Sequence, residues 1–149
     1  MDQTLKQRYP HAIRLDDVHV TLPSRAGPVH ILRGVDLDVT EGEAIAVVGR
    51  SGSGKSTLLM VIAGLERASR GNLQVAGADL NALNEDELAR LRAAKIGIVF
   101  QSFHLVPTMT ALENVALPLE FLDRSDAFAA ARAALNEVGL SHRESHFPG

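Results

Sequence analysis

One stretch of small and polar residues around a single lysine, GRSGSGKST, has the composition of a phosphate-binding loop. Polyphosphate carries several negative charges, so a loop that holds it must present backbone N–H donors and a cation. Glycine adopts backbone angles closed to other residues and lets the chain approach the phosphates closely. We expect the whole stretch to contribute to a nucleotide phosphate site: Gly49, Arg50, Ser51, Gly52, Ser53, Gly54, Lys55, Ser56 and Thr57.

The spacing in this stretch matches the P-loop pattern G-x-x-x-x-G-K-[ST]. An apolar run, 44–48, precedes it and predicts a strand buried on both faces, and residues 55–65 after it predict a helix that ends at or near Gly64. The positive end of that helix then points at the phosphates. In this arrangement Lys55 reaches the β- and γ-phosphates, Ser56 offers a hydroxyl to Mg²⁺ and Thr57 bonds the α-phosphate. A glycine-rich turn with an incidental lysine is the alternative, which the flanking strand and helix disfavour.

Several other segments read as strands. Residues 13–20 are rich in branched side chains. In 35–39 valine and leucine alternate with aspartate, which indicates a strand with one solvent-exposed face. The loop TLPSRAGP separates the two, so we expect an antiparallel, hairpin-like sheet, and TEGE then turns the chain. A short strand over 71–77 and a second buried strand over 96–100 complete the set.

Two capping boxes mark helix starts. Asn84 with Glu87 opens a helix that runs to about Ala94, and Thr110 with Glu113 opens another. We expect the first of these helices to carry a solvated basic face, made of Arg90, Arg92 and Lys95.

Pro118 is expected to kink or end the helix after Thr110 about a turn later, since proline lacks a backbone N–H. Ser125 is expected to cap a last helix, which Gly139 ends. Its apolar face is expected to consist of Phe128, Ala131, Leu135 and Val138.

Composition bounds the function classes. The 149 residues suit one domain, and 46% hydrophobic with 22% charged residues is typical of a folded globular chain. A net charge of -3 lacks the basic excess of a nucleic-acid-binding face, so we expect no nucleic-acid partner. The absence of cysteine fits a reducing compartment. We find no signal-peptide pattern, and the apolar run 58–65 is far shorter than the ~20 residues that span a bilayer.

Two longer stretches carry a family resemblance. LRGVDLDVTEGEAIAVVGRSGSGKSTLLMVIAGLERASRGNLQVAG resembles the ATP-binding subunit of ABC transporters, and LARLRAAKIGIVFQSFHLVPTMTALENVALPLE resembles its lipoprotein-releasing and macrolide-export branch. The resemblance runs from about Ile13 to Pro148. It implies an α/β fold, a P-loop NTPase of the ABC ATPase type with an N-terminal antiparallel β subdomain. It also implies a division into an antiparallel sheet with the P-loop core, 13–100, and a Q-loop with the beginning of a helical subdomain, 101–149.

The same resemblance implies cofactors, roles and partners. The cofactors are ATP and Mg²⁺, and Gln101 touches both the Mg²⁺ and the attacking water, so Lys55 and Gln101 are the expected catalytic residues and Ser56 and Gln101 the expected metal ligands. The implied partners are transmembrane permease subunits and a second ATP-binding subunit, with this chain in the cytoplasm at the inner face of the membrane. Residues 102–110 then face the permease. Either this surface or the domain's own core accounts for the apolar stretch of His104, Leu105, Val106 and Met109.

One position departs from the family pattern. A stacking aromatic for adenine usually follows the first strand, and Leu22 stands there. Tyr9 lies too early to replace it. His30 is an alternative stacking residue, although a plain surface histidine is the simpler interpretation. We therefore expect base recognition to be weaker or less selective.

The hydrolytic machinery of the family has no counterpart here, because no apolar run is followed by Asp-Glu. The LSGG signature, the Walker B strand and the switch histidine would follow the last residues, SHRESHFPG. The resemblance is therefore to an N-terminal portion that lacks the C-terminal half of the core and is not competent for hydrolysis alone. In the family sheet, the runs 44–48 and 96–100 flank strands of the later half. Buried unpaired backbone groups cost about 1–3 kcal/mol each, so we expect the isolated chain to be unstable or molten.

Two other functions stay open at this point. A small-molecule P-loop kinase suits the length, but it needs an arginine-bearing lid and usually opens with the P-loop strand. A non-catalytic remnant that still binds nucleotide is the other alternative.

Overall fold

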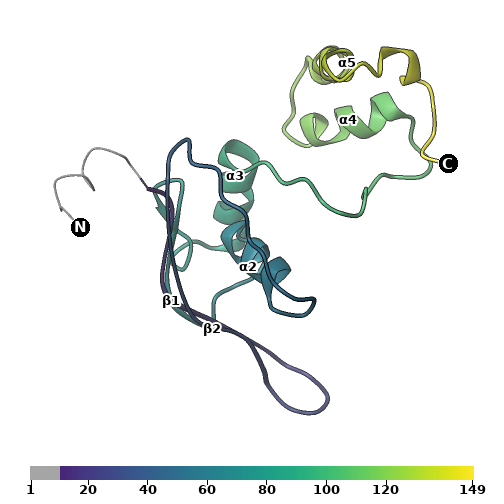
Figure 1. Cartoon of the computed structure of the whole chain (residues 1–149). Helices are drawn as coiled ribbons and strands as arrows, with labels where there is room; N and C mark the ends of the chain where they lie inside the picture. The colour runs from purple at the N-terminus through teal and green to yellow at the C-terminus, as the bar shows by residue number, and fades with distance from the viewer. Residues whose placement is uncertain (1–10) are drawn as a thin grey trace. The chain divides into compact units, whose positions relative to one another are not determined.

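The computed structural model describes residues 11–149, which form two compact units (Figure 1). The first ends at Ile98 and the second runs from Val99 to Gly149. Each is described by itself. Tyr9, weighed above as an adenine-stacking residue, lies outside the described residues.

The first unit is built on an antiparallel sheet in the order β2-β1-β3-β4. Its strands are β1 (His11–Leu22), β2 (Val29–Thr40), β3 (Arg70–Val75) and β4 (Ala78–Asp79). The expected strands at 13–20, 35–39 and 71–77 are confirmed, and so is the hairpin that pairs β1 with β2. The sequence pattern missed the short β4 and the continuity of β2 through the whole of 29–40.

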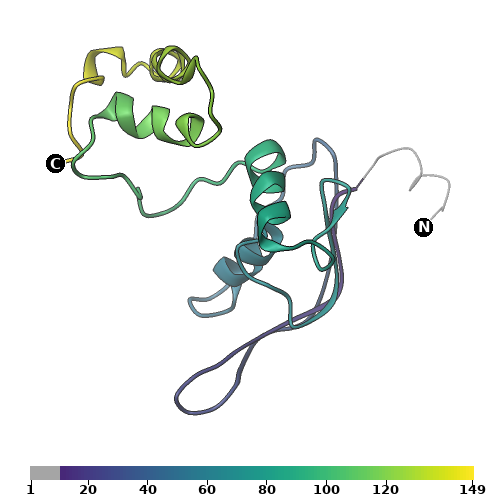
Figure 2. The same ribbon diagram turned by 180° about the vertical axis from the view of Figure 1, so that it is seen from behind.

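Two helices, α2 (Lys55–Ile62) and α3 (Glu85–Lys95), lie against the same side of this sheet (Figures 1 and 2). Val61 of α2 and Leu88 of α3 pack into one core cluster with strand residues such as Leu15 and Leu73. Each of these side chains is almost fully buried, and burial of one such side chain stabilises a fold by about 1.5–3 kcal/mol. The core therefore holds the helix that follows the glycine loop firmly on the sheet.

The contact between the two helices corrects one expectation. Gly64 follows α2 with φ +64°, and a Cβ there would lie 3.2 Å from the Cδ2 of Leu88. Arg92 is half-buried rather than solvated, because its Nη1 donates to the carbonyl oxygen of Gly64 at 2.7 Å. Arg92 thus satisfies a carbonyl at the C-terminal end of α2, while Arg90 and Lys95 are exposed as expected.

The two apolar runs expected to be buried strands are not strands. Residues 44–48 and 96–100 have no regular secondary structure and are mostly exposed, Val48 at 87% and Val99 at 99%. A strand exists only where a neighbour completes its hydrogen-bond ladder, and no described residue pairs with either run. Their backbone groups face water instead of lying buried and unpaired, which corrects the reason given above for an unstable chain.

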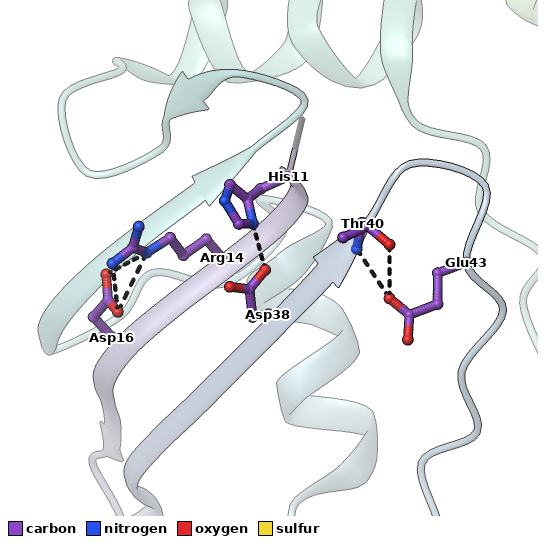
Figure 3. A network of polar contacts seen from close by, with 6 residues as sticks. All are labelled: His11, Arg14, Asp16, Asp38, Thr40 and Glu43. Atoms are coloured by element: carbon purple, nitrogen blue, oxygen red, sulfur yellow. Dashed lines mark hydrogen bonds and ion pairs between the residues drawn. The ribbon is translucent and has the colours of Figure 1, made fainter. Parts of the chain in front are cut away.

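Polar contacts fix the end of the hairpin from which the chain leaves toward the glycine loop (Figure 3). Both the backbone N–H and the hydroxyl of Thr40 donate to Glu43 Oε2, at 3.0 and 3.1 Å, which confirms the turn expected at TEGE. His11 pairs with Asp38 across the two strands. These contacts fix the position from which the segment 44–49 leaves the hairpin.

The second unit consists of α4 (Ala111–Glu120), α5 (Ala127–Glu137) and the short 3₁₀ helix η1 (Ser141–Arg143). The Thr110–Glu113 capping box is confirmed, with both reciprocal hydrogen bonds present. Pro118 lies inside α4, and the helix ends two residues later at Glu120.

Helix α5 differs in detail from its expected form. Its N-cap is Asp126 instead of Ser125, and no side chain caps it. The buried residues are Ala127, Ala131 and Leu135, whereas Phe128 is 39% exposed and Val138 68%. Because α5 packs mainly on one neighbouring helix, only a narrow stripe of residues at a spacing of four is covered. Gly139, with φ +74°, ends the helix as expected. No helix within residues 11–149 has the length and apolar character that a membrane crossing requires.

Candidate phosphate-binding site

The glycine loop ends in a left-handed glycine at the start of α2. Gly54 is the N-cap with φ +90°, and Gly52 before it has φ +78°, which are backbone angles that other residues rarely adopt. A Cβ on Gly54 would lie 3.0 Å from the Cδ2 of Leu32 and 3.2 Å from the carbonyl oxygen of Ile31. Position 54 therefore needs glycine twice over, for its angle and for its close packing on β2.

The N-terminus of α2 presents donors to this loop. The first backbone bond of the helix runs from the N–H of Leu58 to the carbonyl oxygen of Gly54, at 2.8 Å. The N–H groups of residues 55–57 donate to no acceptor among residues 11–149, and no side chain caps the helix. Free first-turn N–H groups together with the helix dipole make this end attractive to an anion.

Lys55 brings a cation to the same place. Its Nζ donates to the carbonyl oxygens of Gly49 at 3.0 Å and Arg50 at 2.8 Å, so the ammonium group lies within the curve of the loop. The N–H of Ser53 donates to the carbonyl oxygen of Arg50 at 3.2 Å and closes the turn. Hydrogen bonds to a phosphate oxygen are stronger than those to a neutral carbonyl, so an arriving phosphate can displace these two acceptors.

The hydroxyl residues of the loop differ in exposure. Ser51, Ser53 and Ser56 are exposed, and Thr57 is half-buried at the first turn of α2. The structure thus brings all nine expected loop residues together in the first unit. The arrangement can bind a polyanion through its backbone N–H groups and one ammonium group. The exposed hydroxyl of Ser56 is also open to a hydrated cation that accompanies the anion.

Gln101 belongs to the second unit, where it is exposed at a bend. Its approach to Lys55 and Ser56 stays a prediction. The segment 102–110 after it contains both exposed and half-buried apolar residues. Phe103 is 88% exposed and Leu105 49%, while Val106 and Met109 are half-buried.

Sequence reasoning missed Asn114, which holds this segment in place. Its Oδ1 accepts from the N–H of Val106 at 2.7 Å, and its Nδ2 lies 3.0 to 3.2 Å from the carbonyl oxygens of Val106, Met109 and Thr110. An asparagine early in a helix, just after a capping threonine, is a signal that points to such local side-chain-to-backbone bonds. Asn114 ties the segment after Gln101 to α4.

Comparison with known families decides the fold family. The profile described as ABC transporter matches residues 32–148, which is most of the chain. The chain belongs to the ABC transporter family. Membership in this family excludes the small-molecule kinase alternative, and it confirms the resemblance that the two long stretches of sequence carry.

Individual relatives from the ABC transporter family agree with this. The chain is 50% identical over 123 residues to the lipoprotein-releasing system ATP-binding protein LolD of Geobacter metallireducens, covering 81% of this chain and 55% of the relative. It is 49% identical over 120 residues to the uncharacterized ABC transporter ATP-binding protein YbbA of Escherichia coli K12, with 79% and 53% covered. The macrolide export ATP-binding/permease protein MacB of Chlorobium luteolum is 44% identical over 138 residues, with 92% and 21% covered.

A solved structure confirms the fold class. The chain superposes with a TM-score of 0.82 and 37% identity on the ATP-binding cassette MJ0796, a dimeric post-hydrolysis state bound to ADP and Pi. This match covers 91% of the chain and 61% of the cassette. The chain spans about half the length of the curated ATP-binding proteins that it matches.

Proposed function

We propose that this chain binds MgATP in the loop 49–57 as part of the ATP-binding subunit of a transporter of the lipoprotein-releasing and macrolide-export branch. The observation that carries the proposal is the loop itself. Its two left-handed glycines lead to free first-turn N–H groups, and the ammonium group of Lys55 is hydrogen-bonded to two carbonyl oxygens of the same loop. Membership in the ABC transporter family supports ATP as the anion.

Three residues of the loop, together with Gln101, have specific roles in this proposal. Lys55 exchanges the carbonyls of Gly49 and Arg50 for the β- and γ-phosphate oxygens, and Thr57 bonds the α-phosphate. Ser56 gives its exposed hydroxyl to Mg²⁺, and Gln101 supplies an amide oxygen to the metal and orients the attacking water. The bound Mg²⁺ supplies neutralisation of the phosphate charge.

The proposed partners are permease subunits and a second ATP-binding subunit, with the chain peripheral at the inner face of the membrane. MacB is named as an ATP-binding and permease protein, and the MJ0796 cassette was solved as a dimer. The exposed Phe103 and Leu105 support a docking surface in 102–110. We further propose that 13–100 forms the sheet and P-loop core and that 101–149 forms the Q-loop and the start of the helical subdomain.

Hydrolysis needs more than these 149 residues supply. An aspartate for the Mg²⁺ shell and a glutamate for the water normally end an apolar strand, and the sequence contains no apolar run followed by Asp-Glu. We propose that these residues contribute the phosphate-binding part of a hydrolytic site, without the aspartate and glutamate that hydrolysis also needs.

Calorimetric titration of the chain with MgATP tests the proposal. Lys55→Ala is expected to weaken binding by roughly tenfold to a hundredfold, since hydrogen bonds to charged groups contribute about 1.5–3 kcal/mol. Lys95→Ala, which removes an exposed ammonium group from the last turn of α3, is the matched control and should leave the Kd unchanged. Equal Kd values for the parent chain and Lys55→Ala would contradict the proposal.

A further inference from the structure

Helix α4 differs from α2 in where the donors of its first turn go. The N–H of Ala111 donates to the carbonyl oxygen of His146 at 2.8 Å. The N–H of Leu112 donates to the carbonyl oxygen of Glu144 at 3.0 Å. These are two of the N–H groups that the start of a helix leaves without a partner inside the helix, and residues 144–146 supply their acceptors. We call residues 144–146 the strap.

The strap is itself fixed to the rest of the second unit. The half-buried Glu144 accepts through its Oε2 from the Nε of Arg132, which lies on α5, at 3.1 Å. The N–H of His146 donates to the carbonyl oxygen of Arg143, the last residue of η1, at 2.9 Å. In Figures 1 and 2 the end of the chain passes beside the start of α4. The strap therefore connects α5 and η1 to the first turn of α4.

The same end of α4 holds a second segment, residues 106–110. Asn114 is bonded to both the N–H and the carbonyl oxygen of Val106, and to the carbonyl oxygen of Met109. Asn114 lies three residues after Ala111, and residues at this spacing are neighbours on a helix surface. The strap and the segment 106–110 are thus attached to adjacent positions at one end of α4.

Neither attached segment has the support of regular secondary structure. Residues 106–110 and 144–146 form turns, a bend and irregular chain, with no helix or strand. Such segments open more easily than helices and strands, since they have fewer hydrogen bonds of their own. Fraying of the first turn of α4 removes partners from both segments at once. The order of one segment is therefore linked to the order of the other, and such a linkage acts equally in both directions.

We propose that the first turn of α4 couples the strap to the segment 106–110, so that loosening either one loosens the other. This goes beyond the proposed nucleotide binding and does not depend on it, because every contact involved lies within the second unit. A partner that binds at the exposed Phe103 and Leu105 and shifts the segment after them also shifts the strap, about forty residues later in the chain.

Ala111→Pro tests the coupling from the side of the strap. The substitution removes the N–H that donates to His146, and proline is well tolerated at the first position of a helix. Thr110 has φ -66° and ψ 168°, the extended backbone that a residue before proline adopts. Hydrogen exchange of the full chain, followed residue by residue by NMR, is the measurement. The amide of Val106 is expected to exchange roughly threefold to tenfold faster, the effect of losing one neutral hydrogen bond.

Asn114→Ala tests the coupling from the other side. It frees the segment 106–110 without touching the strap. Because the coupling is reciprocal, the amides of Ala111 and Leu112, which donate to the strap, are expected to exchange faster by a similar factor.

An arginine pair supplies a second variant with a matched control. Arg132→Ala removes the side-chain bond to Glu144 and leaves the backbone of α4 untouched, so the amide of Val106 should exchange up to about threefold faster. Arg124→Ala removes a comparable exposed ion pair, with Asp126, that makes no contact with the strap. It should leave exchange at Val106 unchanged.

Two results would overturn the inference. One is exchange at Val106 that changes in neither Ala111→Pro nor Arg132→Ala. The other is a uniform acceleration that includes the amide of Leu140, which is bonded to the carbonyl oxygen of Leu135 at the end of α5, because it would report a loss of stability of the whole unit. No nucleotide is present in these measurements, so their outcome is separate from that of the calorimetric titration.

Discussion

Two sets of segments carry strand-like sequences, but only one of them forms strands. β1, β2 and β3 pair with one another and bury the core, whereas the more apolar runs 44–48 and 96–100 pair with nothing among residues 11–149. The difference lies in the number of neighbours that each kind of strand needs. A strand with alternating polar and apolar residues buries one face, which a single layer of helices covers. A uniformly apolar strand needs cover on both faces and ladder partners as well.

The strands of the sheet are close to one another in the sequence, and this explains why they find partners within the described chain. The hairpin loop between β1 and β2 is only six residues long, and β3 returns to β1 directly after α2. The two apolar runs are separated by nearly fifty residues and have no common partner in the described chain. Hydrophobicity alone therefore does not make a strand.

Amide hydrogen exchange is expected to give the largest contrast between these two sets. Amides of β1 and β3 should exchange at least about a hundredfold more slowly than those of 44–48 and 96–100, because ladder bonds must open before exchange. Mass spectrometry of peptic fragments measures this. Equal protection of 44–48 and β1 would break the comparison and show that the run pairs with another chain, which dilution of the sample would then reverse.

A glycine-to-alanine pair sharpens the comparison within the sheet. Gly71 has φ +96°, and a Cβ there would lie 2.3 Å from the carbonyl oxygen of Asp17, a backbone atom that cannot rotate away. Gly71→Ala is expected to destabilise the β1–β3 pairing by about 4 kcal/mol or more. Gly77 has φ +80° with open space around it, so Gly77→Ala carries only the backbone cost of about 1–2 kcal/mol.

Urea unfolding followed by far-UV circular dichroism compares the two variants. Similar midpoints for Gly71→Ala and Gly77→Ala would mean that β1 and β3 do not approach as closely as the structure has them.

The smallest effect concerns the acid stability of α4, where the cap is set by sequence alone. The backbone N–H and hydroxyl of Thr110 both donate to Glu113 and hold the pKa of that carboxyl below its ordinary value of 4.5. Because the folded pKa is the lower one, the cap stabilises α4 fully above pH about 4.5 and is lost as the pH falls through the folded pKa. The backbone amide resonance of Thr110 should therefore titrate with a midpoint below 4.5.

Glu113→Gln should abolish this titration, and Glu120→Gln at the other end of α4 should leave it intact. A site-specific signal is needed because the Arg124 guanidinium also lowers the pKa of Asp126, next to α5. A midpoint at or above the ordinary value would mean that the capping box is open in solution.

The sequence by itself determined the parts of this protein that depend on near neighbours. The glycine loop, the start of α2 at Lys55, both capping boxes and the hairpin follow from patterns a few residues long, because backbone angles, caps and turns are local interactions. Tertiary structure decided what depends on distant neighbours. It left 44–48 and 96–100 without a ladder partner, brought Arg92 to the carbonyl oxygen of Gly64, and placed His30 beside the hydroxyl of Thr21. All three outcomes depend on segments that are far away in the sequence: the partner of a strand, the side chain that reaches a helix end, and the neighbour of a histidine ring. A local pattern contains no information about such segments.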